Sequence, residues 1–304
     1  MAGSAADRRT RLTVLVALAA NLVIAAAKTV GGLASGSPAL LSEAAHSVAD
    51  SLNEVFLLAA LRRSRRPADA RHPFGYGKER FFWALLAAVG IFVMGGCFSF
   101  YQGFSALRRD DQESPEGYTA GLIVLGVAFV AEATSLTRAL HQARGEKRGS
   151  LDPALRTVIA EDSTAVLGVT LAMGGMGLHL ATGSVVWEAA ASLGIGLLLV
   201  YVAFRLGRDA RDQLIGEAVD PELRRDLVGF LMRQSEIDNV AELLTMRLGM
   251  DSVLVAARID LAPGIDSERI EEVSMRIREA MADRWPQADQ VFLDVTNAPP
   301  RAGL

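Results

Sequence analysis

The sequence predicts an α-helical membrane protein with six transmembrane helices and a small C-terminal α+β, ferredoxin-like cytoplasmic domain. The chain of 304 residues is 51% hydrophobic and has a positive mean hydropathy. Up to Leu206, long apolar stretches alternate with short charged ones, and after it the apolar stretches give way to short alternating and amphipathic segments. We therefore expect a transmembrane domain over residues 1–210 and a cytoplasmic domain over residues 211–304.

Each of the six apolar stretches is near or above the roughly 20 residues that a helix needs to cross a bilayer. The first is too long for a cleaved signal peptide and lacks a small-residue cleavage site. The expected spans are Leu12–Gly32, Leu40–Leu61, Phe81–Leu107, Tyr118–Leu140, Ala154–Leu180 and Val185–Leu206.

Lysine and arginine gather on one side of these spans. They cluster before the first span, between the second and third, between the fourth and fifth, and after the sixth. Two of the other connections carry no positive charge, and the remaining one offsets two arginines with four acidic residues. Because positively charged loops stay in the cytoplasm, both termini are expected there. The alanine- and arginine-rich composition suggests the inner membrane of a bacterium.

The cytoplasmic domain is expected to follow the order α-β-β-α-β. Strict alternation of apolar and polar residues predicts its second strand, and proline after an aspartate marks the start of its first helix. Such an order suggests a split-βαβ arrangement. The expected elements are a helix from Pro221, strands at Asn239–Leu248, Val253–Leu261 and Val291–Val295, and a helix capped by Asp266 or Ser267.

One pair of ionisable residues in the second span carries most of the functional information. His46 and Asp50 are four residues apart, so they share a helix face. Placing an ionisable group at bilayer depth costs about 2.5–3.5 kcal/mol, and such groups commonly mark ion or proton pathways. Imidazole nitrogen and carboxylate oxygen are ligands for cations such as Zn²⁺. Glu54, one turn further, either extends this polar face or pairs with a loop arginine.

The fifth span contributes two adjacent carboxylates, Glu161 and Asp162. Neighbouring residues on a helix point about 100° apart, so at most one of them aims straight at the site of the second span. Glu161 is the first candidate, and Asp162 is the alternative.

Other polar residues in the spans are more ambiguous. Interhelical hydrogen bonds are a common use for such groups, and Lys28 is expected to snorkel from its helix end. His179 and His141 fall at span ends and are expected at the membrane interface. The residues expected to bond between helices are Asn21, Asn53, Glu132 and Glu188.

The composition argues against several classes of function. A net charge of -4 gives no basis for binding nucleic acid. A single cysteine allows neither a disulfide framework nor a cysteine metal cluster within one chain. An intramembrane metallohydrolase would also place His and Asp in spans, but the chain has no His-Glu-x-x-His motif. We therefore do not expect an enzyme.

Two segments resemble a known family. The run Ser42–Asn53 (SEAAHSVADSLN) and the loop Pro67–Arg80 (PADARHPFGYGKER), with six spans and a small α+β tail, are similar to the cation diffusion facilitator family of metal–proton antiporters. The resemblance covers nearly the whole chain. It implies a membrane transporter that forms a homodimer through its cytoplasmic domain.

The resemblance also implies a metal site. The first metal pair of the family falls on His46 and Asp50. The second, a His or Asp followed four residues later by Asp, falls on Glu161 and Ala165. This departure resembles the branch related to the animal mitochondrial zinc transporter, where Glu-Asp replaces the usual pair. The implied ligands are His46, Asp50 and Glu161, completed by Asp162, a bidentate carboxylate or water.

Two further sites of the family transfer less completely. Asp69 and His72 match a secondary metal site in the loop after the second span, but Tyr76 stands where some members have another histidine. The cytoplasmic domain has no histidine or cysteine. A regulatory zinc pair there would have to use carboxylates such as Asp289 and Asp294, and we expect it to be absent or weak.

These observations predict efflux of a divalent cation, zinc in the first place, in exchange for protons. Zinc binds neutral imidazole and ionised carboxylates, so that metal and protons compete for the same groups. Zn²⁺ is then the transported substrate and H⁺ the counter-ion, and neither is a cofactor. One nitrogen with two or three oxygens leaves Mn²⁺, Fe²⁺ and Co²⁺ open as substrates. A membrane metal sensor or scaffold without transport is the alternative, because Ala165 replaces a ligand.

Overall fold

The computed structural model describes residues 2–108, 115–145 and 153–296. The chain divides into two compact units. The first comprises Met1–Ala59 and Trp83–Arg208, and the second comprises Ala60–Phe82 and Asp209–Leu304. The second unit thus includes the connection between the second and third spans. The division into a transmembrane domain (residues 1–210) and a cytoplasmic domain (residues 211–304) stays a prediction.

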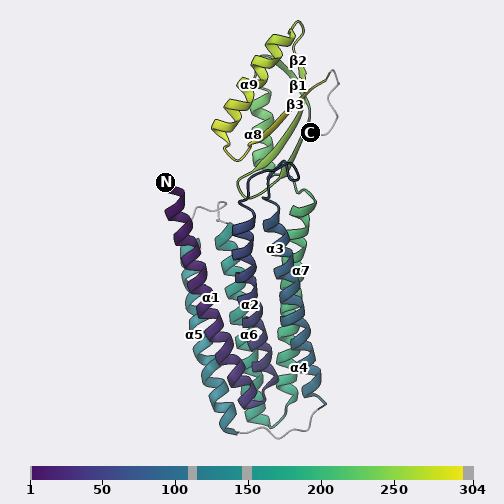
Figure 1. The fold of residues 1–304 in the computed structure, drawn as a ribbon. Coiled ribbons are helices and arrows are strands. Elements are labelled where there is room, and N and C mark those ends of the chain that lie inside the picture. Colours follow the sequence, from purple (N-terminus) through teal and green to yellow (C-terminus); the bar gives the residue numbers. More distant parts are fainter. Residues whose placement is uncertain (1, 109–114, 146–152, 297–304) are drawn as a thin grey trace. The chain divides into compact units, whose positions relative to one another are not determined.

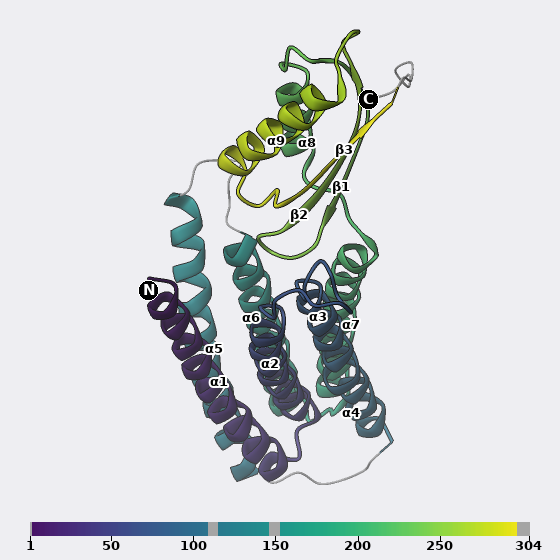
Figure 2. The same ribbon diagram turned by 45° about the horizontal axis from the view of Figure 1, so that its top comes forward.

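The first unit is a bundle of long helices (Figure 1). Figures 1 and 2 both show α1 beside α5, α2 beside α6, and the α3–α4 segment beside α7. The apolar core of the bundle includes Leu40, Leu125, Met176, Ile195 and Leu199. Its elements are α1 (Ala2–Ser35), α2 (Pro38–Arg63), α3 (Glu79–Gly90), η1 (Ile91–Cys97), α4 (Phe98–Ala106), α5 (Pro115–Gly145), α6 (Pro153–Thr182) and α7 (Val186–Ile215).

This bundle confirms the predicted fold class. Among the described residues, five helical segments are long and apolar enough to cross a membrane: Leu18–Ser35, Glu79–Ala106, Gly117–Arg144, Ile159–Thr182 and Val186–Ile215. The remaining long helix, α2, has 26 residues, which at 1.5 Å per residue is about 39 Å. It carries Glu43, His46, Asp50 and Glu54, so its composition alone does not mark it as a span.

The third span contains a feature that hydropathy did not predict. Its middle, Ile91–Cys97, is a π-helix between α3 and α4. Within it, a Cβ at Gly95 would lie 2.8 Å from a methyl group of Leu199, and one at Gly96 would lie 2.9 Å from a methyl group of Val200. Because these glycines have no side chain, the π-helical segment can pack closely against α7.

In the C-terminal part of the second unit, the predicted order α-β-β-α-β is confirmed. The sheet has the order β1-β2-β3, with β1 antiparallel and β3 parallel to β2. The connection between the parallel strands contains α9. The elements are α8 (Pro221–Leu231), β1 (Ile237–Arg247), β2 (Val253–Leu261), α9 (Ser267–Arg284) and β3 (Gln290–Val295).

Apolar residues that alternate with polar ones along the strands form the core of this part. Val255 and Ile259 of β2 pack with Leu227 of α8 and Ile277 of α9. Asp266 caps α9 by accepting a hydrogen bond from the backbone N–H of Arg269 at 2.9 Å. Its carboxylate therefore satisfies one of the free N–H groups at the helix start.

Candidate metal site in the helix bundle

The first predicted ligand pair lies on α2, whose start is well defined. Ser37 precedes Pro38, and its hydroxyl accepts a hydrogen bond from the N–H of Leu40 at 3.2 Å, as an N-cap does. Two to three turns later, His46 Nε2 lies 3.5 Å from Asp50 Oδ2. His46 is buried and Asp50 is half-buried. The spacing of four residues thus brings the two groups together, as predicted.

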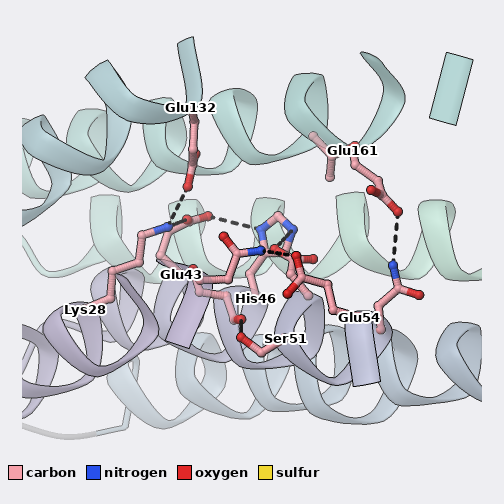
Figure 3. A network of polar contacts seen from close by, with 12 residues as sticks. Lys28, Glu43, His46, Ser51, Glu54, Glu132 and Glu161 are labelled. Atoms are coloured by element: carbon pink, nitrogen blue, oxygen red, sulfur yellow. Dashed lines mark hydrogen bonds and ion pairs between the residues drawn. The ribbon is translucent and has the colours of Figure 1, made fainter. Parts of the chain in front are cut away.

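The carboxylates of α6 lie on the neighbouring helix. Asn53 of α2 donates a hydrogen bond to Glu161 Oε1 at 3.1 Å, so Glu161 lies about one turn beyond Asp50 along α2. Figure 3 shows this contact apart from the His46 group. Asp162 has a buried Oδ2 that accepts no hydrogen bond from a described residue. Asp50 nevertheless interacts electrostatically with both carboxylates of α6.

Contacts at two depths show how α6 faces α2. A Cβ at Gly168 would lie 3.5 Å from His46 Nδ1, whereas Asn53 meets Glu161. Ala165 falls between these two positions of α6, on the face shared by residues four apart. At the depth of His46, therefore, α6 offers a glycine and no ligand.

The predicted ligands are thus neighbours without forming one cluster. In the described parts of the chain, no group of three or more His, Cys, Asp or Glu side chains is arranged to hold a metal ion.

Glu54 extends the polar face of α2 towards α1. Its Oε1 accepts a hydrogen bond from Asn21 at 2.9 Å. Its Oε2 is buried and accepts no hydrogen bond from a described residue. Of the two alternatives for Glu54, the observed contact is with α1 and not with a loop arginine.

A buried ion cluster adjoins His46, and it corrects the expectation for Lys28. Lys28 does not snorkel: it is 1% exposed, and its amine lies 3.0 Å from Glu43 and 3.1 Å from Glu132. Glu43 Oε1 lies 3.7 Å from His46 Nδ1. Figure 3 shows the cluster running from Lys28 and Glu132 through Glu43 to His46. Lys28 fails to snorkel because α1 continues to Ser35, placing it about two turns before the helix end.

Sequence reasoning missed Glu43. The available signal was its spacing: it lies three residues before His46 on the same face of a predicted span.

A second polar cluster lies at the end of the bundle where α2 and α7 begin. Glu188 is fully buried and accepts hydrogen bonds from Ser37 and Tyr118. His179 Nδ1 lies 2.6 Å from Glu188 Oε1 and 2.9 Å from the Tyr118 hydroxyl. Glu188 thus bonds between helices, as expected, and His179 belongs to this buried network.

In the second unit, the loop residues Asp69 and His72 lie together. Asp69 accepts hydrogen bonds from the N–H groups of Arg71 and His72 at 2.9 and 2.7 Å and from the Tyr76 hydroxyl at 2.7 Å. The Tyr76 hydrogen bond is the main reason that the pKa of Asp69 lies below its ordinary value. His72 Nδ1 is 3.5 Å from Asp69. A secondary metal site here stays a prediction.

The two carboxylates considered for a regulatory site have separate protein partners. Asp289 accepts hydrogen bonds from the Ser252 hydroxyl and the Val253 N–H, and Asp294 pairs with Arg258 at 2.8 Å.

Comparisons with known proteins show which family the chain resembles. A model of the cation efflux transmembrane domain matches residues 14–215. The chain is 30% identical over 258 residues to the proton-coupled zinc antiporter SLC30A9, mitochondrial, of Xenopus laevis, covering 81% of this chain and 46% of that protein. It is 31% identical over 265 residues to metal tolerance protein C4 of Arabidopsis thaliana, covering 84% of this chain and 58% of that protein.

A shorter relative matches over nearly its full length. The manganese efflux system protein MneP of Bacillus subtilis (strain 168) is 24% identical over 301 residues, covering 95% of this chain and 96% of that protein. By contrast, the chain spans about half the length of the SLC30A9 and C4 proteins. The family match and these relatives confirm the resemblance noted at Ser42–Asn53 and Pro67–Arg80. The chain belongs to the cation diffusion facilitator family, and it is related there to the animal mitochondrial zinc transporter.

Proposed function

We propose that this protein exports a divalent metal cation, zinc in the first place, in exchange for protons. The observation that carries this proposal is the His46–Asp50 pair within a bundle of membrane-spanning helices, with Glu161 on the adjoining helix. The relation to proteins named as a zinc antiporter and a manganese efflux protein supports it.

The donor set fits a divalent cation. His46 supplies a nitrogen, and Asp50 and Glu161 supply carboxylate oxygens, which are the ligand atoms that zinc takes in proteins. Asp162, with its buried and unpartnered oxygen, is the candidate for the fourth position. One nitrogen among oxygens favours zinc less than two histidines would, so Mn²⁺, Fe²⁺ and Co²⁺ belong in the same test.

Exchange for protons follows from the chemistry of these ligands. The metal requires a neutral imidazole and ionised carboxylates, whereas protons bind to the same groups once the metal has left. We propose that Glu161 turns from Asn53 to Asp50 as the metal binds. Release on the other side of the membrane would let the protonated site return.

The same proposal assigns the remaining parts. Residues 1–210 form the transport domain and residues 211–304 a cytoplasmic domain that makes the protein a homodimer. Both termini lie in the cytoplasm, which the distribution of arginine and lysine between the spans supports. The protein is a multi-pass protein of the bacterial inner membrane, which its alanine- and arginine-rich composition supports. It acts as a transporter and not as an enzyme.

The test is uptake of Zn²⁺, Mn²⁺, Fe²⁺ and Co²⁺ into proteoliposomes under an imposed proton gradient. Asp50→Ala and Glu161→Ala should each abolish uptake, because each removes an anionic ligand. Asp283→Ala, at an exposed position of α9, is the matched carboxylate control and should transport normally.

Full uptake by Asp50→Ala would contradict the proposed site. Metal binding without flux in sealed vesicles would favour a sensor over a transporter. Uptake unaffected by the proton gradient would rule out antiport.

A further inference from the structure

We propose that Glu43 is a positioning residue for His46: it holds the imidazole in the tautomer that leaves Nε2 free for the metal. This inference rests on the proposed function, in which His46 is a ligand. It concerns a residue that does not itself contact the metal.

The geometry of the His46 ring motivates it. Nε2 faces Asp50 Oδ2 at 3.5 Å, and Nδ1 faces Glu43 Oε1 at 3.7 Å. Glu43 is 0% exposed, and its Oε1 accepts no hydrogen bond from a described residue. A buried acceptor without a donor is costly. A shift of about 0.5–1 Å would bring Oε1 within hydrogen-bond distance of Nδ1, so this acceptor is poised for an Nδ1–H donor.

The other oxygen of Glu43 is already engaged. Lys28 donates to Oε2 at 3.0 Å and to Glu132 at 3.1 Å. The ammonium group of Lys28 only donates hydrogen bonds. It holds one oxygen of Glu43 at α1 and leaves the other oxygen facing His46. Its positive charge also compensates Glu43 and makes that carboxylate a poorer metal ligand than Asp50. Lys28 thus orients Glu43 towards the ring instead of towards a cation.

Gly168 of α6 closes this arrangement from the other side. A Cβ at this position would collide with Glu43 Oε1. Glu43 is therefore held between an amine on α1 and a backbone on α6, and Figure 3 shows it pointing towards the His46 ring.

The chemical consequence concerns one proton. A neutral imidazole carries its proton on one nitrogen, and a partner that accepts from Nδ1–H leaves Nε2 with a free electron pair for the metal. Carboxylate partners of this kind orient histidine ligands and raise their basicity, and their removal typically weakens metal affinity about 10–100-fold.

Glu43→Gln tests this directly. The side-chain oxygen of the glutamine must turn to Lys28, because lysine cannot accept, so the amide NH₂ faces Nδ1. Nδ1 then becomes an acceptor, and Nε2 carries the proton. We expect Zn²⁺ to bind the full-length variant about 10–100-fold more weakly than the unchanged protein. In Lys28→Met/Glu43→Gln the amide is free to turn its oxygen to His46, and part of the affinity should return.

Two further measurements separate positioning from loss of charge. Glu132→Gln removes a carboxylate that also contacts Lys28, and it should leave Zn²⁺ affinity nearly unchanged. With four histidines in the chain, nitrogen-15 NMR of histidine-labelled protein, assigned with His46→Ala, reports the tautomer without metal. We expect Nδ1–H in the unchanged protein and Nε2–H in Glu43→Gln.

The inference is overturned if Glu43→Gln keeps both the Zn²⁺ affinity and the His46 tautomer of the unchanged protein. It is equally overturned if Glu132→Gln weakens binding as much as Glu43→Gln. Because the tautomer is measured without metal or flux, it still tests Glu43 if the unchanged protein fails to transport. A failure of the proposed function is thereby distinguishable from a failure of this inference.

Discussion

The helix bundle and the C-terminal sheet both contain three-membered ion clusters, but in different surroundings. Lys28 and Glu43 are 1% and 0% exposed, whereas Arg258 and Asp294 of the sheet are 44% and 63% exposed. Burying charges removes them from water at a cost of several kcal/mol each, and their mutual attraction does not reliably repay it. A cluster kept in the membrane despite this cost points to a function beyond stability, whereas the exposed one needs no such explanation.

The largest expected effect comes from breaking the buried cluster. Lys28→Met leaves Glu43 buried without its cation, and removal of one partner of a buried pair typically costs about 3–5 kcal/mol. We expect a marked fall in the thermal unfolding temperature of the detergent-solubilised protein. An unfolding temperature equal to that of the unchanged protein would show that the cluster is hydrated and that the comparison is wrong.

A smaller effect is expected where α6 meets this cluster. Gly168→Ala places a methyl group against Glu43, and overpacking of this kind typically costs about 1–3 kcal/mol. The matched control is Gly174→Ala on the same helix, where a Cβ meets nothing within 4 Å. The thermal unfolding temperature should be lower for Gly168→Ala than for Gly174→Ala. Equal unfolding temperatures would mean that the Glu43 side chain moves aside without cost.

In the second unit, a partly shielded carboxylate should give a pH-dependent effect. Glu236 accepts hydrogen bonds from Arg276 at 2.7 Å and Arg269 at 3.0 Å. Mainly because of Arg276, its pKa falls from an ordinary 4.5 to about 2. A lowered pKa means that the carboxylate stabilises the fold above pH 4.5 and that this contribution is lost as the pH falls towards 2.

The measurement compares Glu236→Gln with the unchanged protein by urea unfolding, with Trp285 as reporter. Trp285 packs against Phe230 in this unit, and replacing the other two tryptophans, Trp83 and Trp187, by phenylalanine isolates its fluorescence. The difference between the urea midpoints should be greatest at neutral pH and shrink between pH 4.5 and 2. A difference independent of pH would argue against the ion pairs.

The smallest effect is expected for the exposed cluster. Arg258 pairs with Glu242 of β1 at 2.9 Å and with Asp294 of β3 at 2.8 Å. Water screens such pairs, and many contribute nothing measurable to stability. Arg258→Met should therefore leave the thermal unfolding temperature unchanged, and a loss comparable to that of Lys28→Met would remove the contrast between the two clusters.

The sequence predicted the secondary-structure elements and the residues that share a helix face better than the contacts between helices. Hydropathy marks the described spans other than α2, alternation located β2, and a spacing of four residues joined His46 to Asp50. None of these patterns relates helices distant in the chain. Glu132 lies 104 residues from Lys28 in the sequence. Because no pattern relates the two residues, Lys28 was predicted to reach the membrane surface instead of pairing with Glu132. Asn53 was expected to bond between helices, but its partner Glu161 was missed, as was the π-helix at Ile91–Cys97, because packing between helices decides both.

X-ray absorption at the zinc edge, on full-length protein with one equivalent of Zn²⁺, would identify the ligands of the bound metal. A site built from His46, Asp50 and Glu161 should give a first shell of one imidazole nitrogen at about 2.0–2.1 Å and carboxylate or water oxygens at about 2.0–2.2 Å. His46→Ala should remove the imidazole signal, and Glu161→Ala should remove an oxygen. An imidazole signal that survives His46→Ala, or two imidazoles in the unchanged protein, would contradict a site built from His46, Asp50 and Glu161.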